Sequence, residues 1–177
     1  GDHFIASIPV IVPYAAPARE YLALKDEIDA AMDDVLYSGR YVGGKVVEAF
    51  EAEVAAYLGV KYVVAVQSGT QALRVVDDYF IAMESILREP KPLVRVTHWD
   101  GMVGVVARHE IEDAAQAFGS HWDGRKAGTI GVAACFSLHP LKTFSVVGGG
   151  GLVVTEHEGI ADYVRRNRGH GLDAIQC

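Results

Sequence analysis

The segment 111–142 places four polar side chains of different chemistry in a mostly apolar context. They are the carboxylate of Asp113, the amide of Gln116, the hydroxyl of Ser137 and the amine of Lys142. Residues 111–116 are typical of a short strand that ends in a loop, and functional groups gather at the carboxyl ends of strands in α/β sheets. Residues 129–137 are typical of a buried strand, which must end before Pro140 because proline has no place in a central strand. We therefore expect the carboxylate and the amine on loops that follow two strands.

Lys142 and Asp113 together suit one kind of covalent chemistry. Lys142 is flanked by Leu141, Thr143 and Phe144, and apolar surroundings disfavour the charged form of an amine. A neutral amine is the form that makes a Schiff base with a carbonyl compound. Pyridoxal phosphate is the cofactor that uses such a lysine together with a carboxylate at its ring nitrogen, which is the role that suits Asp113. Taken one at a time, a loop lysine is usually a solvated charge and an aspartate after a strand is usually a cap.

A second polar site is predicted at Ser68-Gly69-Thr70. These residues follow 62–66, which is typical of a buried strand, and precede 71–74, which is typical of a helix. The backbone N–H groups at a helix N-terminus carry about half a positive charge, and the glycine and the two hydroxyls would let an anion approach and bind. The turn therefore predicts a phosphate site, and an ordinary helix N-cap is the alternative.

The composition indicates a globular chain of about one domain. The chain has 177 residues, and 50% of them are hydrophobic. This length and this hydrophobic content are enough to bury a core. The formal net charge is −7. Its basic residues form no extended patch, which argues against a nucleic-acid surface. The apolar run 8–16 is interrupted by Pro9 and Pro13, so we expect neither a signal peptide nor a membrane span. Cys135 and Cys177 indicate no disulfide framework, and we expect a cytoplasmic protein.

Helices are predicted near both ends of the chain. Apolar residues recur at helical spacing in 17–38 and again in 45–58. Gly39 and Gly59 follow these runs and are expected to end the helices. A further helix is expected at 158–166.

Two further strands are expected, at 94–99 and at 152–155. The glycine-rich turn 147–151 precedes the second of them. A dinucleotide fingerprint needs a helix after its glycines, so the strand that follows here excludes that motif. We expect these glycines to let backbone pass close to a cofactor.

Five separated segments together resemble the DegT/DnrJ/EryC1/StrS family of sugar aminotransferases. In chain order they are EDAAQAFGS, DGRKAGTIG, CFSLHPLKT, the glycine-rich turn and RNRGHG. The resemblance covers nearly the whole chain. It implies an α/β fold with three layers and a mostly parallel sheet, namely the large domain of a fold-type I, aspartate-aminotransferase-like enzyme, in abridged form.

The resemblance also implies an activity. Enzymes of this family are pyridoxal-phosphate-dependent transaminases that install an amino group on nucleotide-linked keto sugars. We therefore expect pyridoxal 5'-phosphate as cofactor, glutamate as the amino-acid donor, a nucleotide-sugar substrate, a homodimer and no metal site. A dehydratase branch of the family replaces the lysine with histidine, and Lys142 argues against that branch.

Roles for individual residues follow from the same resemblance. Lys142 would tether the cofactor and move protons as a general acid and base. Asp113 would keep the ring nitrogen protonated, so that the ring can withdraw electrons. Gln116 would contact the substituents of the ring, and Phe80, just after Tyr79, would stack on it. The phosphate would be held by Ser68, Gly69, Thr70 and Ser137.

The chain departs from the family in length. Family members are far longer, so we expect residues 1–177 to be an incomplete cofactor-binding large domain without the C-terminal small domain. Internal material is also expected to be short between Val76 and Tyr79, between Leu87 and Thr97, and between Gly101 and Ile111. Hidden gaps there would appear as Cα steps well above the 3.8 Å of a continuous trans chain.

Two other functions remain open from the residues alone. The first is a truncated or non-catalytic remnant of the family, which binds the cofactor or a partner subunit without turnover. The second is a plain nucleotide-binding α/β domain that uses the turn 68–70 for a nucleotide phosphate. A transamination assay would test the first alternative, and titration with nucleotides and pyridoxal phosphate the second.

Overall fold

The computed structural model describes residues 17–87, 95–97 and 110–169, and the chain divides after Tyr41 into two compact units. The first unit contains α1 (Pro17–Ala23) and α2 (Lys25–Ser38), neither of which has a buried residue. Leu24 separates them with φ −117° and ψ 16°, so the helix predicted over 17–38 is interrupted by a bend. Its predicted end is confirmed, because Gly39 has φ 67° and its N–H donates to the Leu36 carbonyl at 3.2 Å.

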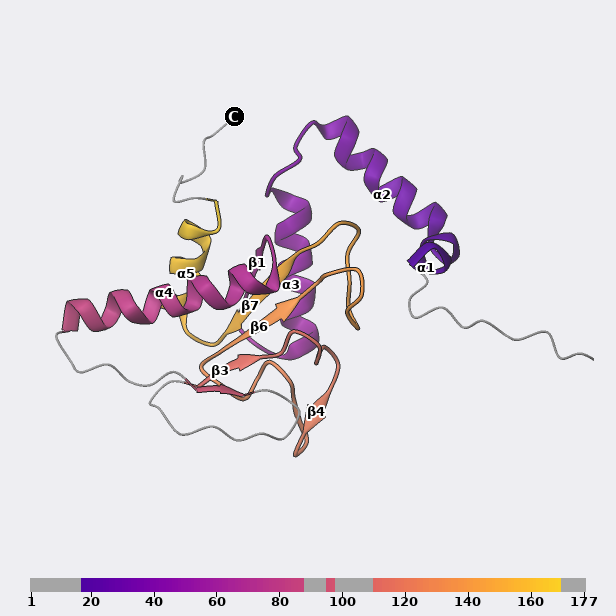
Figure 1. Ribbon diagram of the computed structural model, residues 1–177. Coiled ribbons are helices and arrows are strands. Elements are labelled where there is room, and N and C mark those ends of the chain that lie inside the picture. The colour runs from indigo at the N-terminus through magenta and orange to yellow at the C-terminus, as the bar shows by residue number, and fades with distance from the viewer. Residues whose placement is uncertain (1–16, 88–94, 98–109, 170–177) are drawn as a thin grey trace, which may run out of the picture. The chain divides into compact units, whose positions relative to one another are not determined.

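The second unit is built on a five-stranded sheet (Figure 1). In spatial order its strands are β1 (Tyr62–Val66), β7 (Gly151–Thr155), β6 (Ala133–Ser137), β3 (Glu110–Asp113) and β2 (Arg95–Thr97). β2, β3 and β6 pair in parallel, and β7 pairs antiparallel with both β6 and β1. Four of these five strands therefore point the same way, which confirms the predicted mostly parallel α/β sheet.

Helices cover both faces of the sheet (Figure 1). On one face lies α3 (Lys45–Leu58), and on the other lie α4 (Gly69–Leu87) and α5 (Glu158–Asn167). Val63 of β1 packs in the cluster that contains Val54 of α3, whereas Val64 packs in the cluster that contains Val76 of α4. This alternation arises because successive side chains of a strand point to opposite faces. The three predicted layers are therefore confirmed, with a separate apolar core on each face.

α4 runs without interruption through Val76 and Tyr79, so the discontinuity predicted between these residues is wrong. Apolar residues at helical spacing in this segment bury one face of the helix, and Val75, Val76 and Phe80 all join the same core cluster. The gaps predicted after Leu87 and after Gly101 fall mostly on residues outside the described part of the chain. The strand predicted over 94–99 is confirmed at Arg95–Thr97.

The strand predicted over 129–137 begins only at Ala133. The preceding segment is instead held by the buried carboxylate of Glu112 in β3. Its oxygens accept the N–H groups of Gly128 at 2.8 Å, Ile130 at 2.6 Å and Gly131 at 2.7 Å. Because these backbone donors point to a carboxylate, they are not part of a strand ladder.

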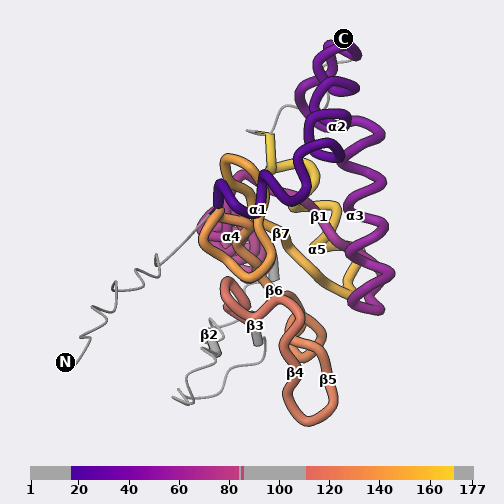
Figure 2. The backbone as a smooth tube through the Cα atoms, turned by 90° about the vertical axis from the view of Figure 1, so that its right-hand side faces the viewer, coloured from indigo at the N-terminus to yellow at the C-terminus, as the bar shows by residue number. Residues whose placement is uncertain are grey.

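A two-stranded hairpin precedes this segment and projects from the sheet (Figure 2). It consists of β4 (His121–Trp122) and β5 (Arg125–Lys126), paired antiparallel. Asp123 and Gly124 form its turn with φ 48° and 74°, which is the geometry that Asp-Gly favours in two-residue hairpins. The hairpin is an addition to the three layers.

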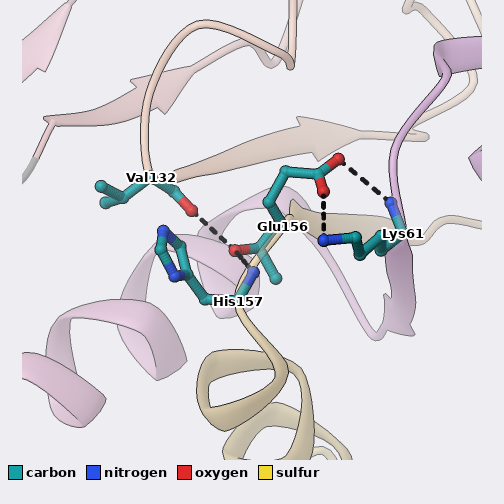
Figure 3. A network of polar contacts seen from close by, with 5 residues as sticks. Lys61, Val132, Glu156 and His157 are labelled. Atoms are coloured by element: carbon teal, nitrogen blue, oxygen red, sulfur yellow. Dashed lines mark hydrogen bonds and ion pairs between the residues drawn. The ribbon is translucent and has the colours of Figure 1, made fainter.

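A network of polar contacts surrounds the connection between β7 and α5 (Figure 3). The Thr155 hydroxyl donates to the Val132 carbonyl at 2.6 Å and accepts the His157 N–H at 3.1 Å. Glu156 accepts the Lys61 N–H at 3.2 Å and pairs with its ammonium at 3.5 Å. Since Thr155 lies opposite the first residue of β1, this network occupies the amino end of β1, away from the carboxyl ends where the site is predicted.

Candidate functional site

Gly151 brings the predicted phosphate turn onto the sheet. This first residue of β7 pairs with Val66 on one side and with Ser137 on the other. A Cβ atom at Gly151 would lie 2.3 Å from the carbonyl carbon and oxygen of Ser68 and 2.7 Å from the nitrogen of Gly69. No side chain fits there, so glycine at this position lets the peptide before α4 lie directly on β7. The glycine-rich turn was predicted to bring backbone close to a cofactor, and at Gly151 the close neighbour is the backbone of Ser68 and Gly69.

Gly69 makes an equally close contact with the end of β6. A Cβ atom at Gly69 would lie 2.8 Å from Cβ and 3.1 Å from Cα of Ser137. Two of the predicted phosphate segments, separated by more than sixty residues in the sequence, therefore meet in the fold. Ser137 is half-buried, and its Oγ accepts the His139 N–H at 3.4 Å.

Ser68 is the N-cap of α4. Its Oγ accepts the N–H of Gln71 at 3.1 Å, and its carbonyl accepts the N–H of Ala72 at 3.0 Å. Thr70 is exposed in the first turn. The first N–H groups of a helix have no acceptor within it, and the aligned peptides of this helix favour an anion at this end. The cap and the anion site, which are alternatives in the sequence, are compatible here, because a capping hydroxyl can still donate its own proton.

Asp113 ends β3 on the same face of the sheet as Ser137. It lies opposite Cys135 in the parallel pairing of β3 with β6, and Ser137 is two residues further along β6, so all three side chains share one face. Cys135 packs in the cluster that contains α4, which identifies this face as the one where α4 begins. The Asp113 Oδ1 accepts the Ala115 N–H at 3.2 Å, and this bond orients the carboxylate in its turn.

The Cys135 thiol in β6 is buried, and the Asp113 and Glu112 carboxylates of β3 affect its pKa. Burial raises the pKa of the Cys135 thiol above its ordinary value of 9.0, and the negative charges of Asp113 and Glu112 raise it further. The thiol is therefore protonated at neutral pH. We assign it no chemistry, because the thiolate is the nucleophilic form of cysteine.

Lys142 lies on the loop that connects β6 to β7, as predicted. The base of this loop is closed where the Leu138 N–H donates to Gly150 at 2.9 Å, and the Lys142 N–H donates to the His139 carbonyl at 2.8 Å. The lysine side chain is half-buried. Its neighbour Leu141 is 53% exposed, so the apolar surroundings expected from the flanking residues are only partly present.

Gln116 lies in the turn after Asp113 and is exposed. The turn is closed by the Ala117 N–H, which donates to the Ala114 carbonyl at 3.0 Å. Gln116 thus shares one short turn with Asp113, and its contact with a bound ring remains a prediction.

Phe80 lies elsewhere, and the prediction that it stacks on a cofactor ring is wrong. The residue is 7% exposed in the core between α4 and the sheet, and Tyr79 packs edge-on against it at 5.2 Å. It is eleven residues into the helix that begins at Gly69, which places it about 16 Å along the helix axis from that N-terminus. The reason for the error is that 79–80 continue the helix and do not lie beyond a further strand and loop.

The structure adds residues that the sequence did not single out. Glu112 is 3% exposed and holds the segment before β6. Phe118 and Phe144 stack with ring centroids 4.2 Å apart and join the turn after β3 to the lysine loop. The sequence contained one indication that the Glu112 side chain faces the core. Glu112 precedes Asp113 in the strand, and adjacent strand residues point to opposite faces of the sheet, so the two carboxylates cannot both lie on the face of the predicted site. No local pattern indicates the Phe118–Phe144 contact.

Among residues 17–87, 95–97 and 110–169, no three or more His, Cys, Asp or Glu side chains lie together as metal ligands would. In the same part of the chain, every helix is too short or too polar to cross a membrane.

The chain is similar to known proteins over most of its length. The model of the DegT/DnrJ/EryC1/StrS aminotransferase family matches residues 23–78 and 105–176. The dTDP-3-amino-3,4,6-trideoxy-alpha-D-glucose transaminase of Micromonospora megalomicea subsp. nigra is 28% identical over 209 residues, which cover 88% of this chain and 56% of that protein. The chain thus spans little more than half the length of this relative. The matched region of 209 residues also exceeds the 177 residues of the chain, so this relative carries additional residues inside it.

Solved structures agree with this fold. The structure of DesV from S. venezuelae, in complex with a ketimine intermediate, has a TM-score of 0.76 and 27% identity, and the match covers 94% of this chain and 59% of that one. A DegT DnrJ EryC1 StrS aminotransferase from Brucella abortus has a TM-score of 0.72 and 22% identity over 93% of this chain and 61% of that one. The second likeness extends to the fold alone.

Proposed function

Because the chain belongs to the DegT/DnrJ/EryC1/StrS aminotransferase family, we propose that it is the cofactor-binding part of an aminotransferase that uses pyridoxal 5'-phosphate. The observation that carries this proposal is the contact of Gly69 with Ser137. It places a capped helix N-terminus and a strand-end hydroxyl together, on the face of the sheet that also carries Asp113. An anion-binding end and a carboxylate on one face suit a ligand with a phosphate and a basic ring.

The residues present fit the phosphate of this cofactor. Gly69 and Thr70 present backbone N–H groups at the start of a helix of nineteen residues, and these groups favour an anion. The hydroxyls of Ser68, Thr70 and Ser137 add hydrogen-bond donors. The close contacts at Gly69 and Gly151 leave no room for a Cβ atom, so this cradle depends on glycine at both positions.

The other residues divide the chemistry between them. When bound, pyridoxal phosphate supplies an electron-withdrawing ring that stabilises negative charge on the α-carbon of an amino acid. Asp113 would keep the ring nitrogen protonated by accepting a charge-assisted hydrogen bond. Lys142 would bind the cofactor covalently through Nζ and, once released, would carry a proton from the α-carbon of the donor as general base and acid. Gln116 would contact the ring substituents from the turn that it shares with Asp113.

The substrates that we propose are an amino-acid donor, glutamate, and a nucleotide-linked keto sugar. This proposal is supported by the relatives, among them the dTDP-amino-sugar transaminase that is 28% identical. We further propose that the active form is a homodimer. A cytoplasmic location suits the free thiol of Cys135, because reducing compartments keep thiols unpaired.

Borohydride trapping tests the proposal directly. Borohydride converts the condensation product of a lysine and a carbonyl group into a stable amine, and mass spectrometry then identifies the modified lysine. We expect a phosphopyridoxyl group on Lys142 and no adduct in Lys142→Ala. The matched control is Lys61→Ala, since the Lys61 side chain forms an exposed ion pair with Glu156 at the other end of the sheet, and it should be labelled at Lys142 as in the wild type. An adduct at Lys45 or Lys126 in place of Lys142 would contradict the assignment.

A second function, cofactor binding without turnover, is favoured by the short interior of the chain. The family match is interrupted between residues 78 and 105, and the relatives carry additional residues within the matched region. A transamination assay with glutamate and a nucleotide-linked keto sugar separates the two functions. Labelling of Lys142 with turnover supports the enzyme, and labelling without turnover supports the non-catalytic form.

A further inference from the structure

The lysine loop and the turn after Asp113 are joined by one pair of aromatic side chains. Phe144 lies two residues after Lys142, and Phe118 lies two residues after Gln116. Their ring centroids are 4.2 Å apart and their planes are inclined by 25°. Stacked aromatic pairs contribute stability beyond the burial of apolar area.

Phe144 anchors the interior of the lysine loop. At its base this loop is held by the Leu138 N–H, which donates to Gly150 at 2.9 Å, and by the Val146 N–H, which donates to Leu138 at 3.1 Å. Between these points Leu141 and Thr143 are exposed, whereas Phe144 packs against the core on the α3 face. Phe144 therefore anchors the loop two residues after Lys142, in addition to the hydrogen bond from the Lys142 N–H to the His139 carbonyl.

Phe118 is connected to Asp113 through a short, hydrogen-bonded segment. The Ala115 N–H donates to the Asp113 carboxylate at 3.2 Å, and the Ala117 N–H donates to the Ala114 carbonyl at 3.0 Å. After Phe118 in the sequence, the Ser120 N–H donates to the Ala117 carbonyl at 2.9 Å. Phe118 therefore belongs to the same hydrogen-bonded turn as the Asp113 carboxylate.

Helix α3 supports both rings from outside the two loops. Tyr57 stacks on Phe118 with centroids 5.4 Å apart, and Phe50 stacks on Phe144 with centroids 6.1 Å apart. These contacts stabilise each ring, but neither of them joins the lysine loop to the turn that carries Asp113. Among the ring contacts of the described residues, the stack of Phe118 on Phe144 joins the two loops, and Phe118 also packs edge-on against Phe136 of β6 with centroids 5.4 Å apart.

We propose that the stacked pair Phe118–Phe144 is a positioning device that sets the spacing between Asp113 and Lys142. This inference rests on the proposed function, in which the two side chains act on one bound cofactor. Neither phenylalanine is a catalytic residue, because each acts through the loop that carries it. The rate of covalent capture is sensitive to this spacing, since a misplacement of 1 Å can cost about a hundredfold in reaction rate.

The first measurement is the rate at which pyridoxal phosphate is captured on Lys142, trapped with borohydride at successive times. The variants are Phe118→Leu, Phe144→Leu and their combination, because leucine keeps an apolar side chain but removes the ring. We expect each single variant to capture about tenfold more slowly. The double variant should be no slower than either single one, because each change breaks the same link. The matched control, Tyr57→Leu, also removes a ring that stacks on Phe118, and it should lower the melting temperature while capture stays within about twofold of wild type.

The second measurement needs no cofactor. Hydrogen exchange at the Lys142 amide, which donates to His139, reports the order of the lysine loop. We expect Phe118→Leu, a change in the other loop, to speed this exchange, and Tyr57→Leu to leave it unchanged.

The outcomes separate this inference from the proposed function. Capture on Lys142 at the wild-type rate in Phe144→Leu, or loss in the double variant equal to the product of the single losses, would overturn the positioning role. Absence of any capture in the wild-type chain would instead overturn the proposed function, whatever the exchange rates show.

Discussion

Gly69, at the first turn of α4, lies against Ser137, the last residue of β6, so closely that a Cβ atom at position 69 would be 2.8 Å from the Ser137 Cβ. Real Cβ atoms do not approach each other to this distance. The contact joins a helix N-terminus to the carboxyl end of a central strand, and with it the two predicted phosphate segments. The contribution of this contact to the free energy of unfolding can be measured without any ligand.

Gly69→Ala is expected to destabilise the fold by about 1–3 kcal/mol, the usual cost of adding atoms to a filled space. Ser137→Gly removes the atom that the new methyl group would meet, so the double variant should recover part of that loss. Urea unfolding of the four chains in the cycle measures this coupling. Gly149→Ala is the control, because a Cβ atom there has nothing within 4 Å, and it should change stability by less than about 0.5 kcal/mol. Strict additivity of the two changes would show that the contact is not a close one.

Asp113→Asn tests the proposed role of the carboxylate. Asparagine keeps the size of the side chain but cannot hold a proton on a ring nitrogen, so we expect the cofactor to bind and transamination to fall by at least about a hundredfold. Asp123→Asn makes the same chemical change in the hairpin turn, where φ is 48°, a conformation that asparagine tolerates. That control should transaminate as the wild type does. Turnover of Asp113→Asn at the original rate would refute the role of this carboxylate.

Glu112→Gln tests the buried carboxylate that holds the segment before β6. Glutamine can still accept the N–H groups of Ile130 and Gly131 through one oxygen, but its amide nitrogen would face the Gly128 N–H, which now donates at 2.8 Å. Leaving a buried donor unpaired costs about 1–3 kcal/mol, so the melting temperature should drop. Glu156→Gln, at an exposed ion pair, should have little effect. Equal melting temperatures for the two variants would show that the hydrogen bonds of Glu112 do not stabilise the fold.

Cys135 gives a prediction for alkaline pH. Because the folded chain raises the pKa of this buried thiol above its ordinary value of 9.0, the unfolded chain loses the thiol proton first as pH rises. The stabilising contribution of the protonated thiol is complete below pH 9 and decreases above it, by up to about 1.4 kcal/mol per pH unit. The difference in unfolding free energy between wild type and Cys135→Ala should therefore shrink from pH 8.5 to pH 10.5. A difference that stays constant across this range would show that the thiol ionises normally in the fold.

Local features of the chain were predictable because short segments encode them. The helix ends at Gly39 and Gly59 follow from the left-handed conformations, with φ 67° and 80°, that glycine adopts readily. The strand that ends at Ser137 and the loop that contains Pro140 follow from a run of small and apolar residues that precedes a proline, which a central strand excludes. The resemblance of five motifs identified the family, which the comparison with the family model confirms.

Errors arose where tertiary contacts override a local pattern. Residues 129–132 have the composition of a strand, but the Glu112 carboxylate takes their backbone donors. Phe80 was placed by its position relative to motifs, whereas the unbroken helix α4 carries it into the core. In both cases the deciding partner lies in another element, and a window of sequence does not contain it.

The residue types of the candidate site were determined by the sequence alone, and their arrangement was decided only by the tertiary structure. Sequence order says nothing about the contact of Gly69 with Ser137, because that contact requires β7 to lie between β1 and β6. The stack of Phe118 on Phe144 likewise depends on the pairing of β3 with β6, which brings the ends of two distant segments to one edge of the sheet. Backbone preferences act over a few residues, whereas strand order is settled by the burial of apolar faces across the whole sheet, and that burial is what brings these side chains together.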